Sequence, residues 1–104
     1  MVITTSENIP NKEITDILGI ARGSTVRARN LGRDIFAVLK NVVGGEIEEY
    51  TKLQADAREQ ALERMIADAI SLDADAVINI RFSTSLIMQG ASEILVYGTA
   101  VKLA

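Results

Sequence analysis

Residues 46–72, EIEEYTKLQADAREQALERMIADAISL, decide the fold, because this long segment combines every local feature that favours a helix. Alanines fill its middle, glutamates crowd its first turn, and Arg64 and Asp68 form an i, i+4 pair. At 100° per residue, one face carries the residues suited to packing on a sheet: Ile47, Tyr50, Ala57, Ala61, Met65, Ala69 and Leu72. We therefore predict one long helix over residues 46–72.

A second apolar flank lies on the C-terminal half of this helix. Leu62, Ile66 and Ile70 are rotated by roughly a quarter-turn or more from the first face. Burying each of these side chains would contribute roughly 1.5–3 kcal/mol, yet a small two-layer domain offers little to cover them. We predict that a second copy covers this flank as an oligomer interface. The alternative is that another helix of the same subunit folds back onto it.

Short β-rich segments lie on both sides of the long helix. Residues 2–5 and 13–21 are predicted strands, although the apolar residues of 13–21 also fit a helical stripe. Gly23 and Ser24 predict a turn that folds residues 13–21 and 25–29 into a hairpin. Residues 76–82 and 94–101 are predicted to form an antiparallel pair joined through residues 90–92.

A second, short helix is predicted over residues 31–41, with Gly44 and Gly45 as the turn into the long helix. The order of strands, helices and strands predicts an α+β fold. In this fold a two-layer structure packs one long and one short helix on one face of a largely antiparallel sheet. Neither residues 2–5 nor residues 94–97 carry a lysine or proline to protect a sheet edge, and a closed ring of copies would remove such edges.

Composition bounds the class of protein. The 104 residues fit one domain, 1–104, and no apolar run approaches the ~20 residues of a membrane span. The first residues show no secretory signal, so a cytoplasmic protein is expected. The net charge of −3 disfavours nucleic acid and anionic membrane as partners.

The absence of cysteine and histidine excludes many kinds of site. Disulfides, thiolate nucleophiles, the usual general base and the commonest metal ligand are all missing. We therefore expect no enzyme activity, no cofactor and no metal site.

Arginines gather between residues 22 and 33 with no acid among them. Arg27 and Arg29 share a strand face and Arg33 follows closely, so several copies in a ring could hold a small carboxylate or phosphate. The candidate ligand-binding residues are Arg27, Arg29, Arg33, Asp34 and Tyr50. The alternative is that these arginines pair with the acidic helix of the same or a neighbouring subunit.

Several segments, in order, resemble the YbjQ family of small bacterial and archaeal proteins, often labelled a heavy-metal-binding domain. These segments are Ile3-Thr4-Thr5, Arg29-Asn30 with Arg33-Asp34-Ile35, Val43-Gly44-Gly45-Glu46 with Tyr50, Ala57-Arg58-Glu59-Gln60-Ala61, Ala74-Asp75-Ala76-Val77 and Gly98-Thr99-Ala100-Val101. The resemblance implies a subunit similar to the dodecin fold, a closed homopentamer and a poorly defined biochemical role. Relatives usually have glycine where this chain has Asp73 and Asn79.

Heavy metals prefer thiolate or imidazole ligands, and this chain offers only oxygens and the thioethers of Met1, Met65 and Met88. The expected function is a homo-oligomeric binding or scaffold protein for a small ligand, such as an anion held between subunits. The alternatives are metal binding, as the family label suggests, an enzyme using Arg33, Asp34 or Tyr50 at an interface, and nucleic-acid binding through the arginine strand.

Overall fold

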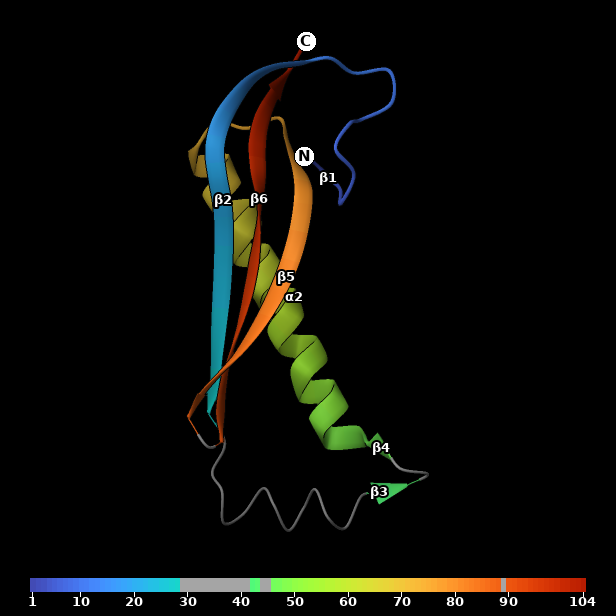
Figure 1. Cartoon of the computed structure of the whole chain (residues 1–104), viewed down its shortest axis with the longest axis vertical. Helices are drawn as coiled ribbons and strands as arrows, with labels where there is room; N and C mark the ends of the chain where they lie inside the picture. Colours follow the sequence, from blue (N-terminus) through green and yellow to red (C-terminus); the bar gives the residue numbers. More distant parts are fainter. Residues whose placement is uncertain (29–41, 44–45, 89) are drawn as a thin grey trace.

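The computed structural model describes residues 1–28, 42–43, 46–88 and 90–104, with side chains described for residues 1–27, 54–88 and 90–104. The elements are β1 (Val2–Ile3), β2 (Ile14–Ala28), β3 (Val42–Val43), β4 (Glu46–Ile47), α2 (Glu48–Ser71), β5 (Ala76–Met88) and β6 (Ala91–Leu103). Figure 1 shows the long helix lying across one face of the sheet formed by the long strands.

The main sheet has the strand order β1-β5-β6-β2. Strand β6 pairs antiparallel with β5 on one side and with β2 on the other, while the short β1 runs parallel to β5. The predicted α+β class and the antiparallel pair at the C-terminal end are confirmed, and the sheet as a whole is mixed. The short β1 confirms the first predicted strand over two of its four residues.

The core lies between α2 and the sheet. Ala57, Ala61, Met65 and Ala69 are 0–1 % exposed and pack with buried residues of β2, β5 and β6. The predicted packing face of the helix is therefore confirmed over this stretch. A smaller cluster on the opposite face of the sheet joins Ala76, Ile78 and Val101 to the loop residue Ile9 and to the paired residues Ile14 and Leu103.

The predicted hairpin at Gly23 and Ser24 is wrong, because β2 is one continuous strand of 15 residues. Gly23 serves a different purpose: a β-carbon at this position would collide with the carbonyl oxygen of Ala61 and the amide nitrogen of Met65. The glycine lets the helix backbone lie directly against the strand. Gly19, with φ of 133°, lies where the pairing of β2 with β6 shifts register.

The helix begins two residues later than predicted, because Glu46–Ile47 forms β4 and pairs antiparallel with β3. The residues predicted as a turn between two helices, Gly44 and Gly45, thus lie in the sequence between the paired strands β3 and β4. The predicted short helix over residues 31–41 lies outside the described residues.

The two positions where relatives usually have glycine both adopt a left-handed backbone. Asp73, in the turn after α2, has φ of 61°, and Asn79, in β5, has φ of 53°. Aspartate and asparagine tolerate this region better than other non-glycine residues. The tight turn and the local irregularity of β5 are therefore kept without glycine.

Candidate functional site

Arg27 is the one predicted ligand-binding residue whose side chain the structure describes. It lies near the end of β2, and its Nη2 donates a hydrogen bond to Oε1 of Gln60 on α2 at 2.8 Å. Its Nε is shielded from solvent and has no hydrogen-bond partner among the residues that the structure describes. Arg29, Arg33 and Asp34 lie outside the described residues, and Tyr50 is placed only as backbone in the first turns of α2.

Thr25 adds a second unsatisfied polar group on the same face of β2, two residues before Arg27. This side chain is 3 % exposed, and its hydroxyl has no hydrogen-bond partner. A buried donor or acceptor left unpaired costs about 1–3 kcal/mol, and more when it is charged. The contact between α2 and β2 therefore contains a polar stretch with spare hydrogen-bonding capacity.

Sequence reasoning missed Gln60 and Thr25. Gln60 looked like an ordinary helix former, and Thr25 looked like an ordinary strand residue. The continuous strand β2 is what places them together, because it directs Thr25 and Arg27 toward the helix.

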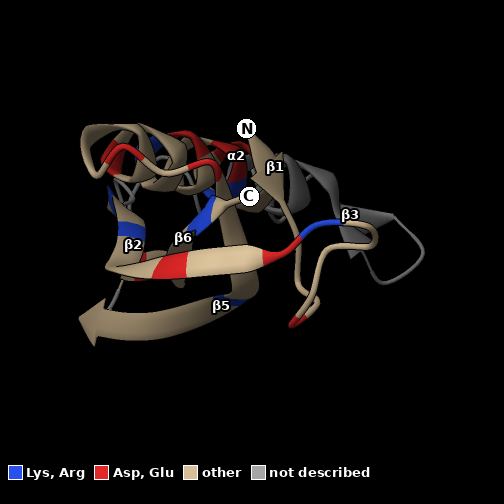
Figure 2. Ribbon diagram, turned by 90° about the horizontal axis from the view of Figure 1, so that it is seen from above, with Lys and Arg blue, Asp and Glu red and all other residues tan. Residues whose placement is uncertain are grey.

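Other charged residues of α2 are engaged with the backbone of β2. The carboxylate of Asp68 accepts the backbone N–H of Arg22 at 2.9 Å, and Nη1 of Arg64 donates to the carbonyl oxygen of Ser24 at 2.7 Å. Figure 2 shows charged positions along both α2 and β2. Among the described side chains, the ion pairs join Lys102 to Asp73 and Asp75, and no carboxylate pairs with Arg22 or Arg27.

The Lys102 cluster lies at the other end of the sheet. Nζ of Lys102 is 3.3 Å from Asp73 and 3.6 Å from Asp75. Asp75 also accepts the backbone N–H of Leu103 at 2.9 Å, which lowers the pKa of this carboxyl, with a further contribution from Lys102. The hydrogen bond to Asp73 raises the pKa of Lys102. These contacts connect the end of β6 to the turn that follows α2.

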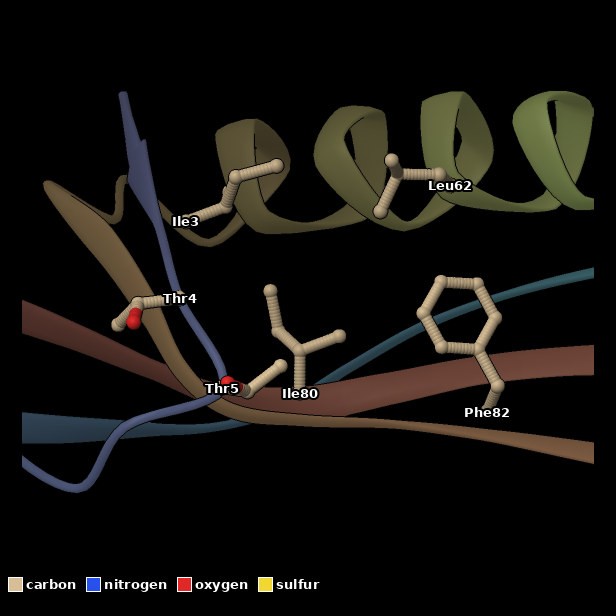
Figure 3. A pocket seen from close by; sticks show the side chains of 6 residues that line it. All are labelled: Ile3, Thr4, Thr5, Leu62, Ile80 and Phe82. Atoms are coloured by element: carbon tan, nitrogen blue, oxygen red, sulfur yellow. The ribbon is translucent and has the colours of Figure 1, made fainter.

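An apolar groove lies between α2 and the β1–β5 edge of the sheet. Its volume is about 250 Å³, and Leu62, Ile80 and Phe82 line it together with Ile3, Thr4 and Thr5. In Figure 3, Ile80 and Phe82 point from β5 toward the helix, and Leu62 points from the helix toward them.

The three residues of the predicted oligomer interface, Leu62, Ile66 and Ile70, differ in their exposure to solvent. Leu62 and Ile66 are partly buried against the core, whereas Ile70 is 63 % exposed.

Comparison with known proteins gives one consistent family. The family model YbjQ_1, described as "Putative heavy-metal-binding", matches residues 1–104. A UPF0145 protein of Archaeoglobus fulgidus is 58% identical over 103 residues, covering 99% of this chain and 95% of the relative. A UPF0145 protein of Methanosarcina acetivorans is 56% identical, covering 99% and 97%.

A solved structure shares the fold. It is a protein of unknown function of the DUF74 family from Pediococcus pentosaceus, with a TM-score of 0.66 and 16% identity, covering 100% of this chain and 98% of that one. This likeness supports the architecture and nothing finer.

The donor set of this chain does not fit the heavy-metal description. Within the described residues, no three side chains of the types His, Cys, Asp and Glu gather as metal ligands would. Asp73 and Asp75 both contact the ammonium of Lys102. The sequence has no cysteine or histidine to supply the ligands that soft or borderline metals prefer. In the same described part of the chain, no helix is long and apolar enough to cross a bilayer.

Proposed function

This chain belongs to the YbjQ family, and from that premise we propose that it is a non-enzymatic, homo-oligomeric binding protein of the cytoplasm that holds a small anion at Arg27. The names of its relatives state neither a ligand nor a reaction. The proposal therefore depends on the chemistry of this chain's own residues.

The observation that carries the proposal is the partnering of Arg27. A neutral amide, that of Gln60, fixes one arm of its guanidinium, while Nε is left without a partner. An arginine that only balanced the acidic helix would contact a carboxylate. A guanidinium that is oriented by a neutral amide has no described carboxylate competing with a carboxylate or phosphate oxygen of a ligand.

A test compares two arginines of the same strand. Arg22 and Arg27 are five residues apart in regularly paired β2, so their side chains lie on opposite faces of the sheet. We expect Arg27→Gln to weaken binding of inorganic phosphate or succinate by at least about tenfold, as loss of a charged hydrogen bond predicts. Arg22→Gln should bind these anions as the unchanged protein does, measured by isothermal titration calorimetry at low salt.

Two outcomes would overturn the anion site. One is an unchanged protein that binds neither anion at millimolar concentration, and the other is an equal loss in both variants, which would indicate a general charge effect.

The homo-oligomer in the proposal is supported by exposed apolar side chains. Among the described residues, Leu86 is 78 %, Ile17 is 74 % and Ile20 is 66 % exposed, and apolar surface of this kind marks interaction sites when it is contiguous. The assembly that the family resemblance implies is a closed pentamer. Sedimentation equilibrium at micromolar concentration should give a mass five times that of the chain, and a stable species of single-chain mass would exclude any oligomer.

A further inference from the structure

The two long edges of the main sheet differ in what covers them. Along β2, the side chains of α2 occupy positions that a neighbouring strand would use: Asp68 accepts the N–H of Arg22, and Arg64 donates to the carbonyl of Ser24. Arg22 and Ser24 are two residues apart on β2, so the backbone N–H of Arg22 and the carbonyl group of Ser24 both point away from β6, toward the open edge of the sheet. The middle of the β2 edge is therefore closed to an added strand.

The β5 edge is covered over its first half only. β1 and the residues after it pair there, with Thr4 N–H to Val77 O at 3.0 Å and Ile80 N–H to Thr4 O at 3.1 Å. Arg81 ends this cover, because its Nη1 donates to the carbonyl oxygen of Thr5. Among the described strands, only β6 pairs with residues 82–88 of β5, and every residue of this stretch is exposed. Figure 1 shows β1 beside the upper part of β5 and no strand of the described sheet beyond the lower part.

This open half of β5, residues 82–88, lacks the devices that keep sheet edges apart. It contains no charged residue and no proline, and Figure 2 shows its arrow end without a charged position. Leu86 is 78 % exposed, and Phe82, Ile87 and Met88 are each at least half exposed. The register with β6 shifts between Leu86 and Met88, so the regular stretch is residues 82–86.

The exposed area is large enough to matter for association. The four apolar side chains of the open half expose on the order of 400 Å², about half of the ~800 Å² that each partner buries in a standard interface. The apolar groove continues this surface, since Phe82 also lines it. An added strand with its own side chains would supply the remaining area and would bond the unpaired backbone groups.

We propose that the open half of β5 accepts a strand from a second copy of this chain, with an apolar side chain of that copy filling the groove beside Phe82. The proposal rests on the homo-oligomer proposed above and assigns its contact. A second copy suffices as the partner, because each copy also carries a stretch of the β2 edge that precedes the hydrogen bonds from Asp68 and Arg64. That stretch is residues 14–20 of β2, where Ile17 and Ile20 are exposed. Both stretches expose apolar side chains, although the β2 stretch also carries Asp16. A contact between unlike surfaces of identical chains can close into a ring.

The test uses two substitutions of exposed apolar residues with the same charge change. We expect Leu86→Lys to convert the oligomer to a single-chain species in sedimentation equilibrium, because a lysine on an open edge opposes strand addition. Ile70→Lys, on the exposed side of α2, should leave the oligomer intact. Circular dichroism of both variants verifies that the subunit remains folded.

Hydrogen exchange tests the same contact without a substitution. β6 can bond only the amides of residues 83–87 that face it, so protection of the others requires a strand on the open side. We expect nearly all amides of this stretch to be protected in the unchanged oligomer, and every second one to exchange rapidly in Leu86→Lys.

The outcomes separate this contact from the proposed function. A monomeric unchanged protein would overturn both the homo-oligomer and the contact. An oligomer that survives Leu86→Lys, or that dissociates with Ile70→Lys instead, would overturn the β5 contact alone. Rapid exchange of alternate amides in an intact oligomer would do the same.

Discussion

At the scale of single residues, Gly23 shows how one missing methyl group fixes the spacing of two layers. Its backbone lies so close to Ala61 and Met65 that a β-carbon has no room. The atoms in the way belong to the helix backbone, so a side chain cannot rotate aside to relieve the collision. The helix or the strand would have to move.

We predict that Gly23→Ala destabilises the protein by about 3 kcal/mol or more, at the upper end of the cost of overpacking a core. Urea unfolding followed by circular dichroism measures this change. Ser24→Ala is the matched control, since the hydrogen bond from Arg64 goes to the backbone of this residue and survives. A loss below about 1 kcal/mol for Gly23→Ala would contradict the close approach of helix and strand.

Sequence reasoning succeeded at residues whose role is local. Ala57, Ala61, Met65 and Ala69 repeat at helical spacing, so the buried face of α2 follows from the sequence itself. The role of Gly23 could not be predicted, because a glycine in a sequence can indicate either a turn or a place where two backbones lie close together. Only the position of Ala61 and Met65 in the structure distinguishes these two roles. Gln60 carried no signal at all, because its contact with Arg27 joins residues 33 positions apart.

At the scale of elements, Asp75 joins the end of β6 to the turn between α2 and β5. Its carboxylate accepts the N–H of Leu103 and contacts Lys102. Both contacts favour the ionised form, so the pKa of Asp75 is lower in the folded protein than the value of 3.8 for a free side chain. The contribution of Asp75 to stability is therefore complete above pH 3.8 and is lost as the pH falls through the lowered value.

We predict that Asp75→Asn lowers the melting temperature at pH 7 and that the difference from the unchanged protein shrinks below pH 3.8. Differential scanning calorimetry between pH 2 and pH 7 measures it. Since the backbone hydrogen bond from Leu103 is the largest cause of the lowered pKa, about 1 M salt should leave most of the difference in place. A difference that stays constant with pH would contradict this role of the carboxylate.

Element boundaries were predictable where the hydrophobic period is strong. The helix predicted over residues 46–72 is observed as Glu48–Ser71, and the strands predicted over 76–82 and 94–101 lie within β5 and β6. Each of these strands extends beyond its predicted stretch, and residues 83–88 of β5 are exposed throughout. The prediction followed the β-rich run of residues 76–82, and it ended where the serines of residues 83–85 interrupt that run.

At the scale of the whole molecule, the absence of cysteine and histidine sets a testable limit on the family's description. The carboxylates of Asp73 and Asp75 are both in contact with Lys102. We predict that equimolar zinc(II) or copper(II) leaves the melting temperature unchanged, since no thiolate or imidazole is present to bind them. Elemental analysis of protein purified without chelator should find neither metal in stoichiometric amount. A stoichiometric metal, or a clear rise in melting temperature, would restore the heavy-metal function.

The middle of the β2 edge, where Asp68 and Arg64 bond the backbone of Arg22 and Ser24, affects how this protein behaves at high protein concentration. A misfolded or foreign chain that approaches this margin meets a carboxylate where it needs a carbonyl and a guanidinium where it needs an amide. Fibril growth, which proceeds by stacking strand on strand, finds no template there. The helix α2, which packs against the core, therefore also prevents the addition of amyloid strands to the middle of β2.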